Sequence, residues 1–153
     1  MGVVYHANFL PYFETGRTEL LRSLGRSYRD VEDAGLLLVV ADAGLKFHRP
    51  AAYDDLLRVT TRLVALTGVR LRFEYAVDRE ADGVLVATGH TTLASTDRVG
   101  RPVRIPAEFH RLLTEVVEPV AAPSEGPRAS PEGPRGPAFG KIARGPGVQG
   151  RTS

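Results

Sequence analysis

A change of pattern at Gly35 constrains the fold of this chain most: apolar residues are spaced for a helix before it and for strands after it. The helical stretch begins after Asn8, which can cap it. Its buried face is predicted to carry Phe9, Phe13, Leu20 and Leu24, widened by Leu10 and Leu21. Recurrence every three to four residues is typical of a helix with one apolar face. Gly16 lies inside the stretch, so we expect it to allow close packing against a sheet.

Beyond this point apolar and polar residues alternate, which is typical of strands with one buried face. We predict strands over 36–47, 57–63, 71–77 and 84–96. The first should contain a bulge near Gly44. A hairpin turn at Asp82–Gly83 should precede the last strand. A short helical turn over 27–33 and a final helix starting at Pro106 complete the prediction.

The predicted order is one helix, at least four antiparallel strands and a short helix. A sheet with one buried face needs a cover, and one long apolar helix can supply it, so we predict an α+β domain over 1–118. The remaining segment, 119–153, holds seven of the eleven prolines and seven of the sixteen glycines. Such a segment cannot bury enough surface to offset its ordering entropy, so we predict a disordered tail.

Charge and composition exclude several kinds of protein. The tail carries five basic and two acidic residues, which leaves 15 basic and 16 acidic residues in the first 118, so we expect no nucleic-acid partner. We expect no membrane span, because no apolar run reaches about 18 residues. The chain has no cysteine, which excludes disulfides and a cysteine nucleophile. With no sign of a secretory signal peptide, we expect a cytoplasmic protein.

Three landmarks carry a family resemblance. The first is the stretch 2–10, GVVYHANFL, which is followed by Tyr12, Phe13, Glu14 and Arg17. The second is 50–57, PAAYDDLL, and the third is 100–106, GRPVRIP. In this order, over about residues 2–116, they resemble the hydroxybenzoyl-CoA and YbgC-type acyl-CoA thioesterases.

The resemblance implies a hot-dog fold, in which a curved sheet wraps one central helix. It implies a homodimer or homotetramer with active sites between subunits, and hydrolysis of an acyl-CoA thioester to free acid and CoA. No separate cofactor is implied, because coenzyme A is part of the substrate. The family pattern also has a first strand and a catalytic aspartate before the glycine that matches Gly2. We therefore expect a hot-dog domain that lacks both.

The resemblance places the substrate carbonyl at the start of the first helix, near Val4–Asn8. Unpaired N–H groups there can stabilise an oxyanion, with the backbone N–H of His6 as a donor. The side chain of His6 matches the catalytic histidine, which would orient water or move a proton. The alternative is that His6 only caps and packs the helix. Val4 and Asn8 are predicted to contact substrate, and Tyr5 to line the acyl pocket or take part in the chemistry.

Glu14 lies eight residues after His6, on roughly the same helix face, and could substitute for the missing aspartate. Alternatively, it pairs with Arg17 or with a neighbouring strand. No metal site is expected, because His48, His90 and His110 lie on different predicted elements without ligand spacing.

Cationic and small residues are expected to bind the phosphates of coenzyme A. The family places these contacts near the turn between two strands, where Thr67, Gly68, Arg70 and Arg72 match, and Arg101 and Arg104 are further candidates. The alternative is that these arginines belong to a solvated strand face. A second functional hypothesis also stays open: a hot-dog module that binds acyl-CoA or a protein partner without turnover.

Overall fold

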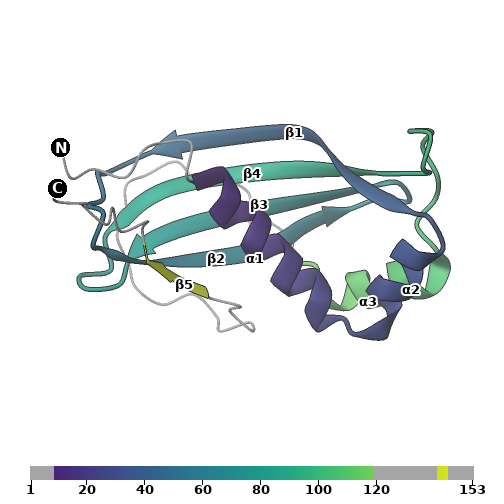
Figure 1. Cartoon of the computed structure of the whole chain (residues 1–153), viewed down its shortest axis with the longest axis horizontal. Helices are drawn as coiled ribbons and strands as arrows, with labels where there is room; N and C mark the ends of the chain where they lie inside the picture. The colour runs from purple at the N-terminus through teal and green to yellow at the C-terminus, as the bar shows by residue number, and fades with distance from the viewer. Residues whose placement is uncertain (1–8, 119–140, 145–153) are drawn as a thin grey trace, which may run out of the picture.

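The computed structural model describes residues 9–118 and 141–144. A curved antiparallel sheet wraps around one helix, α1, as Figure 1 shows. The elements are α1 (Phe9–Ser23), α2 (Arg26–Asp33), β1 (Leu37–Phe47), β2 (Leu56–Leu66), β3 (Arg70–Arg79), β4 (Leu85–Thr96), α3 (Ala107–Val116) and β5 (Lys141–Arg144). The strands lie in the order β1-β4-β3-β2-β5, and each neighbouring pair is antiparallel. The predicted α+β class is confirmed.

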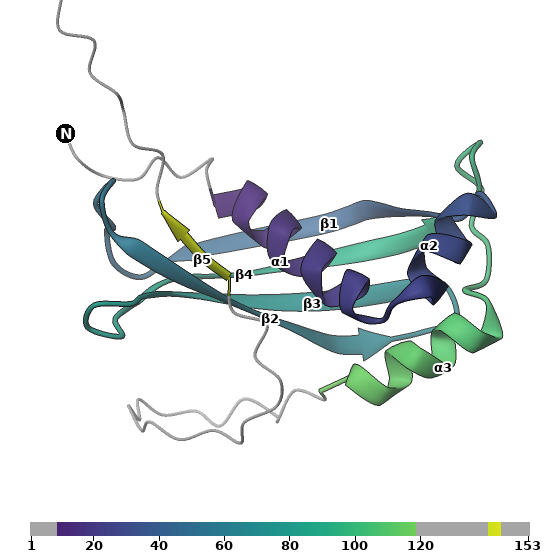
Figure 2. The same ribbon diagram turned by 60° about the horizontal axis from the view of Figure 1, so that its bottom comes forward.

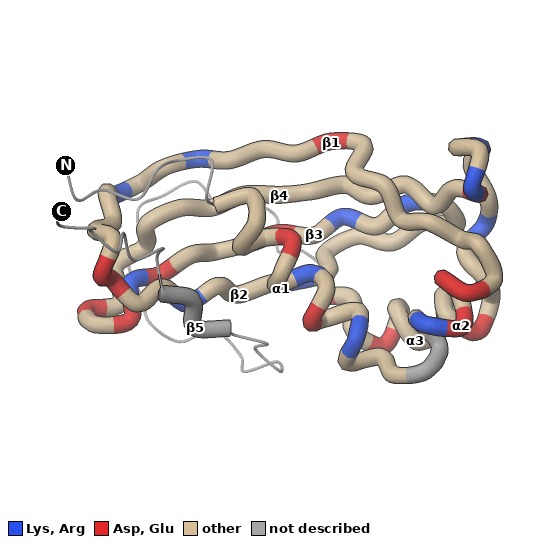
Figure 3. Tube along the Cα trace, viewed as in Figure 1, with Lys and Arg blue, Asp and Glu red and all other residues tan. Residues whose placement is uncertain are grey.

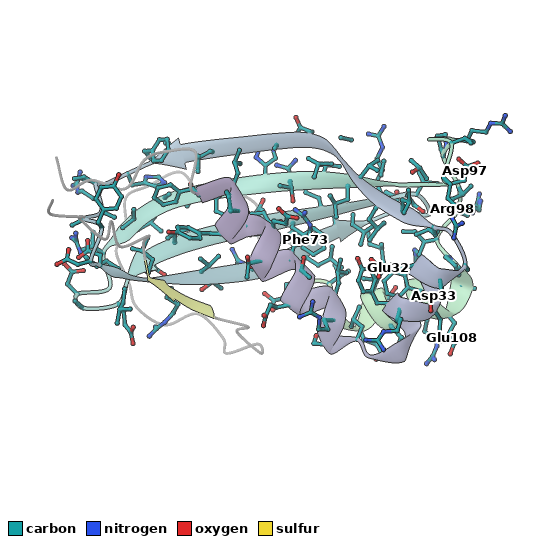
Figure 4. The ribbon with its side chains drawn as sticks, in the orientation of Figure 1. Glu32, Asp33, Phe73, Asp97, Arg98 and Glu108 are labelled. Carbon is teal, nitrogen blue, oxygen red and sulfur yellow. The ribbon has the colours of Figure 1, made fainter. Side chains whose placement is uncertain are left out.

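The core lies between α1 and the concave face of the sheet. From the helix, the buried side chains are Phe9, Phe13, Leu20 and Leu21. From β3 they are Leu71, Phe73, Tyr75 and Val77, which alternate with more exposed residues as the sequence predicts. Figure 4 shows Phe73 beneath α1. Both predicted periodicities are therefore confirmed, because each apolar face meets the other. The prediction that Leu10 widens the buried face of α1 is wrong, because its side chain is 49% exposed.

Gly16 brings α1 against the sheet, as expected. A Cβ atom at this position would overlap Thr61 Oγ1 on β2. Glycine is needed here for distance rather than for backbone freedom, because the side chains of β2 occupy the space that a methyl group would fill.

Substituting Gly16→Ala should therefore destabilise the protein, although alanine is the better helix former by about 1 kcal/mol. We expect overpacking to cost about 1–3 kcal/mol, and so to outweigh the gain in propensity. Thr61→Ala removes the overlapped hydroxyl, which has no hydrogen-bond partner, so Gly16→Ala should cost less in that background. Urea unfolding of the wild type, the two single variants and the double variant measures the energetic coupling between positions 16 and 61. A higher unfolding midpoint for Gly16→Ala alone would contradict the packing argument.

The predicted bulge in β1 is at a different residue. The register between β1 and β4 shifts between Val40 and Asp42, whereas Gly44 pairs regularly with His90. The expectation of a bulge near Gly44 was therefore wrong in position. A Cβ atom on Gly44 would overlap the imidazole of His90, which lies across the strand and bonds Asp42 Oδ2 at 2.9 Å. Gly44 makes room for a cross-strand side chain instead of bending the strand.

The turns and helix ends lie close to where the sequence predicts them. Gly25 and Gly83 have positive φ values of 81° and 69°, which suit the end of α1 and the hairpin turn before β4. Pro106 directly precedes α3, which buries Phe109 and Leu113.

One element was not expected. β5 forms inside the segment that we predicted to be disordered, so that prediction is wrong for Lys141–Arg144. These four residues pair with the outer side of β2, where backbone groups of an edge strand are available. The rest of the predicted tail, 119–140 and 145–153, lies outside the described residues.

Candidate active site

The start of α1 lies against the end of β1. The buried ring of Phe9 contacts the ring of Phe47 edge-on, at 5.4 Å between centroids, and that of Tyr12 at 5.9 Å. The first turn of the helix carries no acidic residue, and Figure 3 shows that charged residues begin only in the second turn. Its N–H groups therefore keep the partial positive charge of a helix start, with no carboxylate in that turn to neutralise it.

A stack of two buried rings holds α1 over the centre of the sheet. The ring of Phe13 stacks on Tyr75 at 4.4 Å, with 9° between the planes. The hydroxyl groups of Tyr75 and Thr91 are 2.7 Å apart. Burial raises the pKa of Tyr75, and hydrogen bonds with Thr91 and Arg17 partly offset this. The ring of Tyr75 thus packs against α1 through Phe13, and its hydroxyl joins β3 to β4 through Thr91, so the helix is held against the sheet.

Sequence reasoning did not identify this contact. The available signal was a tyrosine on the buried side of an alternating strand, because a buried phenol usually finds a hydrogen-bond partner.

Glu14 is exposed on α1 and borders a hollow of about 610 Å³ between α1, α2, β1 and β4. Within residues 9–118, no ion pair joins Glu14 to Arg17 or to a strand, so the predicted alternative pairing is not formed there. Tyr28 lies in the same hollow. Its burial and its hydrogen bond to Glu32 raise the pKa of Tyr28 to about 12, so it is a neutral group at physiological pH.

The remaining helix-start candidates, Val4, Tyr5, His6 and Asn8, lie outside the described residues. What the structure adds is the element that follows them: α1 begins at Phe9, directly after Asn8. The motif over residues 2–8 therefore leads straight into an uncharged helix start.

Several predicted phosphate-binding residues do meet, at the turn between β2 and β3. Thr67 Oγ1 accepts a hydrogen bond from the backbone N–H of Arg70 at 3.0 Å, which closes the turn. The carbonyl oxygen of Gly68 accepts one from the N–H of Ile105 at 2.8 Å. This bond brings Arg104 next to Gly68, and both Arg70 and Arg104 are exposed.

The other two candidates lie elsewhere. Arg101 follows the turn after β4, where its backbone N–H donates to Asp97 Oδ1 at 2.9 Å. Figure 4 shows Asp97 and Arg98 at the tip of this turn. Arg72 lies further along β3 and borders a second hollow, of about 530 Å³, with Lys46 and Arg62.

The two parts of the predicted site lie at opposite ends of one chain. The start of α1 contacts Phe47, at the end of β1. The β2–β3 turn lies near the beginning of β1, because Ser95 N–H bonds Val69 O while the adjacent Thr96 pairs with Leu37. A single chain therefore does not bring Arg70 and Arg104 to the helix start.

Comparison with known proteins identifies the family. The sequence model of the thioesterase-like superfamily matches residues 1–113, which include the helix-start motif and the β2–β3 turn. The chain belongs to this superfamily. A curated relative, the acyl-CoA thioesterase YbgC of Haemophilus influenzae, is 33% identical over 115 residues, covering 72% of this chain and 85% of the relative.

Solved structures agree with this. The DHNA-CoA thioesterase of Staphylococcus aureus is similar at a TM-score of 0.69 and 28% identity, covering 76% of this chain and 80% of that protein. A hypothetical protein of Thermus thermophilus, TT1821, is similar at a TM-score of 0.69 and 37% identity, covering 76% and 88%. The fold is the hot-dog fold, as the resemblance implied, and the protein is a thioester hydrolase.

Two further features concern the part of the chain that the structure describes. In residues 9–118 and 141–144, no group of three or more histidine, aspartate or glutamate side chains is placed to hold a metal ion. Among the helices described, none has the length and apolarity needed to cross a membrane.

Proposed function

We propose that this thioesterase hydrolyses a small acyl-CoA thioester to the free acid and CoA, without a bound cofactor. The observation that carries the proposal is the position of the motif over residues 2–8 directly before an uncharged helix start, which Phe13 and Tyr75 fix on the sheet. The similarity to an acyl-CoA thioesterase and to a DHNA-CoA thioesterase supports the substrate class.

In the proposed reaction the thioester carbonyl lies at the start of α1, where its oxygen accepts a hydrogen bond from the backbone N–H of His6. Water attacks the carbonyl carbon and gives a proton to the His6 side chain, which returns it to the departing sulfur. The C–O bond forms, the C–S bond breaks, and the products are a carboxylic acid and the CoA thiol. Val4, Tyr5 and Asn8 contact the acyl group. Glu14 is the described carboxylate nearest in sequence to His6, and is our candidate to hold the water.

We further propose that the site is completed by a second copy of the chain. The outer side of β1 has no paired strand among the described residues, and its exposed apolar side chains include Leu37, Val39, Val40 and Phe47. If two copies pair antiparallel along β1, a two-fold axis brings the partner's β2–β3 turn to the start of α1. The partner's turn can then supply cations to the CoA phosphates. Two such dimers would form the tetramer that the family resemblance implies.

The double substitution Val39→Asp/Val40→Asp should separate the dimer and lower activity together. Both side chains are about half exposed in one chain, and pairing along β1 would bury their new charges without partners. Sedimentation velocity should show a monomer with a much lower kcat/KM for acyl-CoA. Val99→Asp is a matched control, because Val99 is 74% exposed in the turn after β4. A fully active monomer would contradict the shared site.

Release of thiol from short-chain, long-chain and aromatic acyl-CoA substrates tests the proposed function. We expect saturable turnover with at least one of them. Binding of CoA without turnover on any substrate would overturn the proposal in favour of a hot-dog binding module.

We also place the protein in the cytoplasm, since a chain without cysteine cannot use the disulfides common in secreted proteins.

A further inference from the structure

The hollow of about 610 Å³ described above follows one side of α1. Its lining residues from this helix recur every three to four positions, which places them on one face: Glu14, Arg17, Thr18, Leu21 and Arg22. Gly16 lies on the opposite face, where the helix touches β2. The helix therefore leaves space over β1 and β4, where Leu38 and Leu93 line the hollow. In Figure 2, α2 lies beside the end of α1, at the end of the sheet where β1 begins.

The hollow gathers cationic side chains that no described carboxylate pairs with. The charged residues that line it are Arg17, Arg22, Arg29, Glu14 and Glu32. Within residues 9–118, no ion pair includes any of these three arginines. The carboxylate of Glu32 is engaged instead with the hydroxyl of Tyr28. The guanidinium groups are therefore available to an anion that enters the hollow.

Arg17 is the most sheltered of the three. Its side chain is partly buried, whereas Arg22 and Arg29 are exposed. It hydrogen-bonds the hydroxyl of Tyr75, which is a neutral partner. A charged side chain that is removed from water usually has a partner of opposite charge, and Arg17 has none among the described residues. Its planar fork of N–H groups matches the two oxygens of a carboxylate.

The other lining residues indicate which anion fits. Leu21, Leu38 and Leu93 give the hollow an apolar wall beside the arginines. Glu14, our candidate to hold the attacking water, borders the same hollow, and Arg17 follows it by about 4.5 Å along the helix axis. An acyl chain that enters the hollow from the thioester therefore meets both an apolar wall and a cationic group.

We propose that this hollow binds the terminal carboxylate of a dicarboxylic acyl group, with Arg17 as its main partner and Arg22 and Arg29 at its exposed rim. The inference rests on the acyl-CoA hydrolysis proposed above and names the class of acyl group. The phosphates of CoA are the other anions of such a substrate. Their candidates at the β2–β3 turn, Arg70 and Arg104, do not line the hollow, so we assign it to the acyl end.

The first test compares acyl-CoA substrates with the same number of carbons that differ in a terminal carboxylate: glutaryl with pentanoyl, adipoyl with hexanoyl, and suberoyl with octanoyl. The wild type should have the higher kcat/KM for the dicarboxylic member of at least one pair. Arg17→Gln should lower the ratio of the two kcat/KM values by about 10–100-fold, the usual range for a hydrogen bond to a charged group.

Two further variants separate binding from folding. Arg22→Gln/Arg29→Gln changes only exposed side chains, so it should fold normally and should also lower the ratio, although by less than Arg17→Gln. Arg111→Gln is the matched control, because Arg111 is exposed on α3 and does not line the hollow. It should keep the ratio of the wild type, and circular dichroism should show that all three variants are folded.

Binding of small esters gives a readout that does not depend on turnover. Monomethyl adipate carries an ester in place of the thioester and a free carboxylate at its other end, whereas methyl hexanoate lacks the carboxylate. Isothermal titration calorimetry should show that the wild type binds monomethyl adipate more tightly than methyl hexanoate. Arg17→Gln should lose this difference.

The outcomes distinguish the hollow from the proposed activity. Turnover with equal ratios in the wild type and Arg17→Gln, and equal binding of the two esters, would overturn the inference and leave the hydrolysis intact. A loss in Arg17→Gln that is equal for both members of each pair, and extends to binding of free CoA, would place a CoA phosphate in the hollow and would also overturn it. Absence of turnover on every acyl-CoA would contradict the proposed function, while binding of the two esters would still decide whether the hollow takes a carboxylate.

Discussion

Replacing His6 by alanine is expected to lower kcat for acyl-CoA hydrolysis by about 10²–10⁴-fold, the usual contribution of a positioned general acid or base. The substitution removes the imidazole but keeps the backbone N–H that we propose as an oxyanion donor. Some catalysis by the helix start should therefore remain above the rate in water. KM should change little, because the imidazole acts on water and sulfur rather than on the bulk of the substrate.

The readout must separate chemistry from folding. His110→Ala is the matched control, because His110 lies on α3, next to α2 and away from the start of α1. Both variants should keep the wild-type circular dichroism spectrum and bind CoA normally, and only His6→Ala should lose turnover. If His6→Ala kept most of the wild-type kcat, the histidine would be a capping and packing residue, which was the other interpretation of its place in the motif.

Local sequence patterns predicted the elements of the hot-dog domain because each pattern reflects one buried face. The spacing of Phe9, Phe13 and Leu20 predicted α1, and the alternation around Phe73 predicted β3, since the fully buried side chains of both elements are apolar or aromatic. Gly16 was interpretable for the same reason: a glycine in the middle of an apolar helix face indicates a close neighbour.

Features that depend on a distant partner could not be predicted in this way. The role of Gly44 depends on the imidazole of His90, 46 residues later in the sequence. The contact between Arg17 and Tyr75 needs the helix to lie in one orientation over β3. The sequence of β5 is too short and too polar to indicate a strand by itself. It pairs with the outer edge of β2, which no local pattern reveals.

The same limit applies to the site. The motif over residues 2–8 indicated the chemistry, and the match at Thr67–Arg70 indicated a second cluster, but only the register of the strands shows that these lie at opposite ends. A site divided between copies leaves no signal in the spacing of residues along one chain.

Phe13→Ala is expected to have the largest effect on stability, a loss of about 3–5 kcal/mol in the free energy of unfolding. The side chain is 1% exposed, stacks on Tyr75, and occupies the space that a Cβ atom on Gly89 would need. Its loss leaves a cavity between α1 and the sheet that Gly89, which has no side chain, cannot fill. Urea unfolding at one fixed protein concentration measures the effect, with Thr15→Ala as a control on the exposed face of the same helix.

The pH dependence of the unfolding free energy of Phe13→Ala shows whether the new cavity reaches Tyr75. Because folding raises the pKa of Tyr75, the folded protein holds this proton more strongly, and stability should fall as the pH rises above the ordinary tyrosine value of about 10. Phe13→Ala admits water to the phenol, which should lower the pKa of Tyr75 and flatten that fall. An equal loss of stability with an unchanged pH dependence would mean that Phe13 supports α1 without shielding Tyr75 from water, and would contradict the shielding.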